Sequence, residues 1–110
     1  MQVTPTKPLG LKLMCPAKPV MVPVTGGGKA DPGAVGKAIT AQTVMLVASA
    51  PCFPYGVVDP VQVLGKLALR HGVLLHVDAC LGGFMLPFLE ELGYEIPVFD
   101  FRVAGVSSIS

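Results

Sequence analysis

The chain has 110 residues, of which 52% are hydrophobic and only 14% charged, and its formal net charge is +1. This length allows one domain at most, with a modest core. Acids and bases are mixed along the chain, so no basic patch supports nucleic-acid binding. Because average soluble domains carry about 25% charged residues, the composition predicts a fragment of a larger α/β protein, or an obligate oligomer.

The cysteine pattern and the length of the apolar runs indicate which compartment and which class of protein the sequence fits. Cys15, Cys52 and Cys80 are an odd number without framework spacing, which fits a reducing compartment. No apolar run reaches the ~18 residues of a membrane-spanning helix, and prolines break any secretory pattern near the N-terminus. Residues 1–18 are predicted to be an irregular lead-in to the folded part, residues 19–110.

The first half of that part alternates strand and helix. Val20–Val24 resembles a short or edge strand, because prolines flank and interrupt it. A glycine loop follows, and Asp31-Pro32 then predicts a helix start that runs to about Thr40. The apolar run Thr43–Ala48 predicts a strand that is buried on both faces.

The second half repeats this order. After a loop at Pro51–Gly56, Asp59-Pro60 repeats the capping signal and predicts a helix that Gly72 ends. Further predicted elements are a buried strand at Val73–Val77, a short helix at Phe84–Leu92, and strand material at Phe99–Phe101 and Val106–Ile109.

Strands that alternate with helices predict an α/β fold with a mostly parallel sheet and flanking helices. Right-handed crossovers then bring the connections that follow the strands to one edge of the sheet. We therefore expect the Pro51–Gly56 loop and Asp78 to lie at that edge, where open α/β sheets bind ligands.

The segment L-H-V-D-A-C-L-G-G-F (75–84) carries most of the functional information. Asp78 ends an apolar strand, and a buried carboxylate is costly unless a cation or hydrogen-bond donors meet it. His76 and Asp78 share one face of the strand, and Cys80 joins them if the strand continues. Three hypotheses follow: a solvated or capping Asp78, a metal site from His76, Asp78 and Cys80, or a carboxylate that meets a cationic ligand.

This segment and its flanks resemble the sphingosine-1-phosphate lyases, which are pyridoxal-phosphate enzymes of the group II decarboxylase (carboxy-lyase) type. The resemblance extends upstream through M-L-V-A-S-A-P-C-F-P-Y-G-V-V-D-P-V (45–61) and downstream through F-D-F-R-V-A-G-V-S-S-I-S (99–110). It covers about residues 19–110 and implies part of the large cofactor domain of the fold-type I class.

The resemblance implies a cofactor site for pyridoxal 5'-phosphate around Asp78. In the family, the matching Asp bonds the pyridine nitrogen; Ala79 would then lie near the ring, and His76 in the shell that supports it. A carboxylate beside the nitrogen favours its protonated form, and the protonated ring stabilises a carbanion at the substrate's α-carbon. The cation that Asp78 requires would thus be the pyridinium.

The resemblance also implies the properties of the whole enzyme. Its reaction is a retro-aldol cleavage of a phosphorylated sphingoid base to a long-chain aldehyde and phosphoethanolamine. Family members are expected to be homodimers on the endoplasmic reticulum membrane, with the catalytic part facing the cytosol and held by an anchor that this sequence lacks. The Schiff-base lysine of the family would follow Ser110, so we expect the 110-residue piece to be inactive by itself.

Two other functions remain open at this point. One is a pyridoxal-phosphate amino-acid decarboxylase, which shares the H-V-D-A core but is disfavoured by C-L-G-G-F and F-D-F-R-V. The other is a non-catalytic truncated product, because the sequence ends before the lysine segment. No metal is implied by the resemblance.

Overall fold

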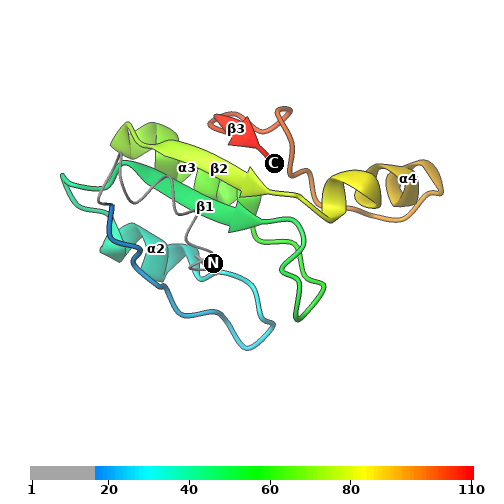
Figure 1. The fold of residues 1–110 in the computed structure, drawn as a ribbon, viewed down its shortest axis with the longest axis horizontal. Helices are drawn as coiled ribbons and strands as arrows, with labels where there is room; N and C mark the ends of the chain where they lie inside the picture. The colour runs from blue at the N-terminus through cyan, green and yellow to red at the C-terminus, as the bar shows by residue number, and fades with distance from the viewer. Residues whose placement is uncertain (1–16) are drawn as a thin grey trace.

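The computed structural model describes residues 17–110, so the predicted lead-in at 1–18 lies almost wholly outside the described residues. Figure 1 shows the elements in chain order. They are α2 (Pro32–Ala38), β1 (Met45–Ser49), α3 (Val61–His71), β2 (Leu74–Asp78), η1 (Gly82–Phe84), α4 (Leu86–Glu91) and β3 (Ser108–Ile109). Within this part of the chain, none of the helices has the length and hydrophobicity needed to cross a bilayer.

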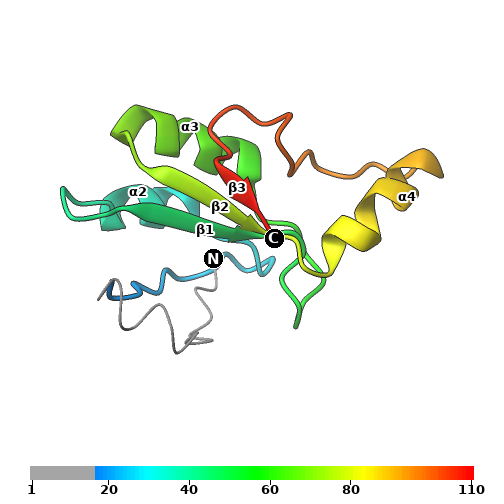
Figure 2. The ribbon, with the colours of Figure 1, turned by 45° about the horizontal axis from the view of Figure 1, so that its top comes forward.

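The sheet has three strands in the order β1-β2-β3, and both pairs are parallel. The register places Ser49 opposite Asp78 and His76 opposite Ser108. Because all strands run the same way, their carboxyl ends meet at one edge, next to the C-terminus (Figure 2). The predicted α/β fold with a parallel sheet and flanking helices is confirmed.

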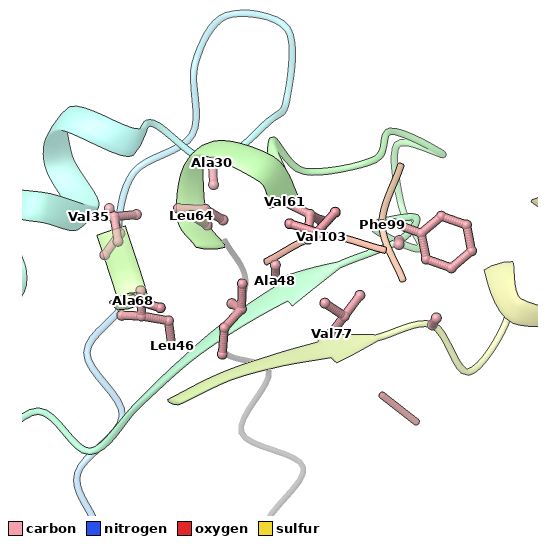
Figure 3. Packing of buried hydrophobic residues seen from close by; sticks show 14 of the residues in the cluster. Ala30, Val35, Leu46, Ala48, Val61, Leu64, Ala68, Val77, Phe99 and Val103 are labelled. Carbon is pink, nitrogen blue, oxygen red and sulfur yellow. The ribbon is translucent and has the colours of Figure 1, made fainter. Parts of the chain in front are cut away.

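The core lies between the sheet and α3 (Figure 3). Alternate residues of the strands point to this side, and Leu46, Ala48, Leu75 and Val77 are buried there. The buried residues of α3 recur at helical spacing and form its apolar stripe: Val61, Leu64, Gly65 and Ala68. The apolar residues that recur every 3.6 positions in α3 therefore pack against those that recur every two positions in the strands, and together they form one apolar layer.

The opposite face of the sheet is open within the described residues. Met45 and Leu74, which are register partners, remain 42% and 51% exposed. The prediction that the strands are buried on both faces is therefore wrong for this part of the chain, because α3 covers one face only (Figures 1 and 2).

Three predicted strands differ from the structure. Val20–Val24 forms only one isolated antiparallel bridge, between Val24 and Ala30, because Pro19 and Pro23 have no N–H to donate to a ladder. Phe99–Phe101 belongs to a turn region rather than a strand. The strand expected at Val106–Ile109 is reduced to the two residues of β3.

Both predicted helix starts hold, but only one acid caps its helix. Asp31 caps α2, and its carboxylate accepts hydrogen bonds from the amides of Gly33 and Ala34 at 2.8 and 3.3 Å. In α3 the cap position falls on Pro60, which offers no side-chain bond. The capping role predicted for Asp59 is wrong, because its carboxylate is bound to amides elsewhere in the fold.

The helix end predicted at Gly72 is confirmed, whereas α2 ends at Ala38, before the predicted Thr40. Gly72 follows α3 in the left-handed conformation, with φ 65°, and its amide bonds the carbonyls of Ala68 and Leu69. The short helix expected at Phe84–Leu92 is divided into η1 and α4, with Pro87 in the first turn of α4. In Figure 1, α4 lies beyond the carboxyl ends of the strands, away from the sheet.

Candidate functional site

Asp78 is the last residue of the central strand, at the sheet edge where the three strands end. Its carbonyl accepts a hydrogen bond from the amide of Ala50 at 2.8 Å, so the chain that leaves β1 runs beside it. On the other flank, the amide of Ala79 donates to the carbonyl of Ser110 at 3.1 Å. The backbone on both sides therefore fixes the position from which the Asp78 side chain projects.

The Asp78 carboxylate is half-buried and has one hydrogen bond among the described residues. Its Oδ1 accepts from the amide of Cys80 at 3.3 Å. The ion pairs within residues 17–110 belong instead to Arg102, which bonds Glu90 and Asp100. The side-chain cation that the sequence leads us to seek for Asp78 is thus absent from the described part of the chain.

A cavity of about 220 Å³ lies beside this carboxylate. Two segments form it, the loop that follows β1 and the turn that follows β2. The lining residues are Ser49, Pro51, Cys52, Phe53, Asp78, Cys80 and Leu81. The expected meeting of the Pro51–Gly56 loop with Asp78 is confirmed, and the cavity combines one acid and a hydroxyl with apolar and thiol walls.

Gly82 brings these two segments together. A Cβ at this position would collide with the carbonyl oxygen of Ala50 and with Cδ of Pro51. The absence of a side chain therefore allows the turn after β2 to contact the backbone after β1 directly. Gly82, the first of the two glycines in C-L-G-G-F, therefore makes this contact.

His76 lies on the same face of β2 as Asp78 but does not line the cavity. Its Nδ1 is 2.8 Å from Oγ of Ser108, the residue opposite it on β3. This bond fixes the imidazole ring and links the central strand to the edge strand. Ala79 has its side chain buried in the core cluster, and only its backbone lies at the sheet edge.

The metal hypothesis receives no support from the arrangement. Cys80 is exposed, and its Sγ lies 3.3 Å from Oγ of Ser110. Across residues 17–110, no group of three or more His, Cys, Asp or Glu side chains is placed to hold one ion.

Sequence reasoning missed Ser49 as a lining residue, whereas Cys52 and Leu81 belong to the two segments expected at this edge. Ser49 is only 8% exposed, yet it borders the cavity directly beside Asp78. A parallel register between the two predicted strands would have identified it, because the residue opposite Asp78 on the neighbouring strand shares its face.

Comparisons with known proteins place the chain in context. No family model matches it. The sphingosine-1-phosphate lyase of Arabidopsis thaliana is 55% identical over 89 residues, which are 81% of this chain and 16% of that protein. The L-aspartate decarboxylase of Thermococcus kodakarensis is 53% identical over 76 residues, which are 69% of this chain and 20% of that protein. The chain therefore spans about a sixth to a fifth of the length of these relatives.

Solved structures agree with the sequence relatives. The sphingosine-1-phosphate lyase of Burkholderia pseudomallei matches with a TM-score of 0.80 and 49% identity, over 82% of this chain and 21% of that one. An aspartate aminotransferase variant of Thermus thermophilus matches with a TM-score of 0.50 and 36% identity, over 54% of this chain and 17% of that one. By sequence and by fold, this chain belongs with the sphingosine-1-phosphate lyases, as one segment of that family's sequence.

Proposed function

We propose that this chain forms the ring-nitrogen side of a pyridoxal-phosphate site in a lyase that cleaves phosphorylated sphingoid bases. The observation that carries the proposal is the half-buried carboxylate of Asp78, which has no side-chain cation partner in residues 17–110 and borders a cavity at the carboxyl end of the sheet. The similarity to sphingosine-1-phosphate lyases supports both the cofactor and the substrate class.

The residues around the cavity fit a protonated heteroaromatic ring. Asp78 supplies a negative charge that a ring N–H⁺ can meet, because an opposite charge nearby stabilises the protonated form. Pro51, Phe53 and Leu81 supply apolar contacts for the ring, and the Ser49 hydroxyl adds a polar group next to the acid. Pyridoxal phosphate, when bound, supplies an electron sink for a carbanion at the substrate's α-carbon.

Each predicted site residue has a distinct proposed role. Asp78 holds the proton on the ring nitrogen. His76, fixed by Ser108, keeps the strand in place behind that acid. Ala79 acts through its backbone, which joins β2 to the chain at Ser110, rather than through a side chain that faces the core.

A segment replacement tests this function. The matched segment of the Burkholderia pseudomallei lyase is exchanged for the corresponding residues of this chain, and the hybrid is assayed with sphingosine 1-phosphate. We expect bound pyridoxal phosphate and release of a long-chain aldehyde. Asp78→Asn in the hybrid should lower kcat about 100-fold or more, since the charge that holds the ring proton is lost.

Asp100→Asn serves as the matched control, because this acid belongs to an exposed ion-pair cluster and does not line the cavity. It should leave kcat within about twofold, as expected for a surface change. Full activity of the Asp78→Asn hybrid, or a hybrid that releases no aldehyde while it retains the cofactor, would contradict the proposed function.

A second candidate is an amino-acid decarboxylase that uses the same cofactor. The 53% identity to an L-aspartate decarboxylase favours this alternative over other enzyme classes. Product analysis separates the two, because a decarboxylase hybrid releases carbon dioxide and an amine from L-aspartate and no aldehyde from sphingosine 1-phosphate.

The remaining implications of the resemblance stay predictions. They are the assignment of residues 19–110 to a cofactor domain, the homodimer, and the position on the cytosolic face of the endoplasmic reticulum.

A further inference from the structure

Asp59 is a second acid near the site, and it is far more deeply buried than Asp78. It is only 2% exposed. Its two carboxylate oxygens are bound separately: Oδ1 accepts from the amide of Ala30 at 2.8 Å, and Oδ2 from the amide of Ser49 at 2.9 Å. A buried carboxylate persists in a fold when such donors offset its loss of water.

The bond to Ser49 is one half of a two-way contact. While the Ser49 amide donates to Asp59, the Asp59 amide donates to the carbonyl of Ser49 at 3.0 Å. The last residue of β1 is thus held through both of its backbone polar groups. A residue held in this way cannot rotate its peptide groups without breaking at least one of the two bonds.

Ser49 lines the cavity on the β1 side, and the residue after it connects this wall to Asp78. Ser49 lies opposite Asp78 in the register and lines the cavity. The next amide, that of Ala50, donates to the carbonyl of Asp78 at 2.8 Å. A short hydrogen-bonded path therefore leads from Asp59, through Ser49 and Ala50, to the acid at the centre of the site.

The bond to Ala30 extends this arrangement to a distant segment. Ala30 is 1% exposed and directly precedes the cap of α2. Asp59 follows the loop after β1 and precedes α3, so one side chain joins the entries to both helices and the end of β1. Figure 3 shows Ala30 next to α3 on this side of the sheet.

We propose that Asp59 is a positioning residue, which sets the β1 wall of the cavity relative to Asp78 and thereby the affinity for the cofactor ring. The inference concerns the geometry of the cavity. Its second statement, that this geometry sets the affinity for the cofactor ring, rests on the proposed function. An acid at a helix entry usually bonds the first amides of its own helix. Here that interaction is given up, and the carboxylate binds the backbone of the cavity wall instead.

The first test uses the 110-residue chain and Asp59→Asn, which keeps the shape but replaces one acceptor oxygen with an NH₂ group that faces an amide donor. Asp31→Asn is the matched control, because Asp31 also accepts two backbone amides but lies away from the cavity. We expect NMR shift changes at the amides of Ala50 and Cys80 and at the carboxyl carbon of Asp78 for Asp59→Asn only. Equal shifts in both variants, or none in Asp59→Asn, would overturn the proposal.

A measurement on the unmodified chain decides the question if Asp59→Asn does not fold. Native-state hydrogen exchange should show the amides of Ala30, Ser49 and Ala50 opening together, with the same dependence on denaturant, because one carboxylate holds this unit. Independent opening of Ser49 and Ala50 would contradict the proposal.

The cofactor part is tested in the hybrid lyase by titration with pyridoxal phosphate. We expect Asp59→Asn to weaken cofactor affinity about tenfold and to shift the absorption maximum of the bound cofactor, as a small displacement of a binding wall does. Asp31→Asn should change neither quantity. If the unmodified hybrid binds no cofactor, the proposed function fails, whereas the NMR and exchange results on the chain still decide the role of Asp59.

Discussion

At the scale of single residues, Gly82 determines whether the cavity beside Asp78 can form. Its Cα lies against the backbone of Ala50 and the ring of Pro51, where no larger residue fits. Gly83, the next residue, has open space instead, since a Cβ there would only reach the Cβ of Ala79 at 4.0 Å. Two adjacent glycines thus have unequal structural roles.

This difference predicts opposite tolerance to alanine. Gly82→Ala should lower the free energy of unfolding by about 2 kcal/mol, because the backbone after β1 must move away. Gly83→Ala should change it by less than about 0.5 kcal/mol. Urea titrations followed by circular dichroism measure both values, and a tolerated Gly82→Ala would show that the two segments are not in contact in solution.

At the scale of elements, α4 is held to the chain that returns to the sheet by one arginine. Both terminal nitrogens of Arg102 bond the carboxylate of Glu90 on α4, at 3.1 and 3.0 Å. The same guanidinium bonds Asp100 through Nε and Nη2, at 2.9 Å each. These hydrogen bonds lower the pKa of both carboxyls.

The lowered pKa values predict how this link responds to acid. Because each carboxyl titrates at lower pH when folded than when unfolded, its stabilising effect is present above the unfolded pKa and is lost as the pH falls through the folded one. Arg102→Gln should therefore lower the urea midpoint slightly at pH 7, and the difference should close as the pH falls through the lowered pKa values of Glu90 and Asp100.

Lys66→Gln is the control for this experiment, since it removes the same charge from an exposed helical position that forms no ion pair within residues 17–110. The difference in urea midpoint between Lys66→Gln and the unmodified chain should not close in this way as the pH falls. A gap between Arg102→Gln and the unmodified chain that persists at pH 2 would indicate a packing effect of the arginine stem. High salt should shrink the gap at pH 7, because both pairs are exposed.

At the scale of the whole molecule, the sheet is covered on one side and open on the other within the described residues. Met45 and Leu74 are adjacent register partners on the open face, and both are substantially exposed. Contiguous apolar surface of this kind favours association with another apolar surface. We therefore expect the isolated 110-residue chain to self-associate through this face.

The double substitution Met45→Thr and Leu74→Thr tests that expectation. Threonine retains a high β-propensity, so the sheet should persist while the apolar surface decreases. Sedimentation at about 100 μM should show a smaller weight-average mass for the double variant than for the unmodified chain, in line with the lost apolar area. The exposed pair Val63→Thr and Leu69→Thr on α3 is the control, and an equal decrease there would show that the association is not specific to the sheet.

The sequence predicted those features that arise from local chemistry. The order of strands and helices, the Asp31 cap, the Gly72 terminus and the position of Asp78 all depend on residues within one element or its ends. Features that depend on distant backbone groups were wrong or missed. Asp59 looks like a helix cap by spacing, but its partners are 29 and 10 residues away, and Ser49 becomes a site residue only through the register with β2.

The central placement of β2 has a further consequence for how a ligand is captured. Backbone bonds from Ala50 on one flank, and between Ala79 and Ser110 on the other, immobilise the peptide that carries Asp78. The backbone entropy lost in placing this carboxylate is consequently lost when the chain folds, not when a cation arrives. Capture by such a preorganised acid requires little reorganisation, so tight binding needs few additional contacts.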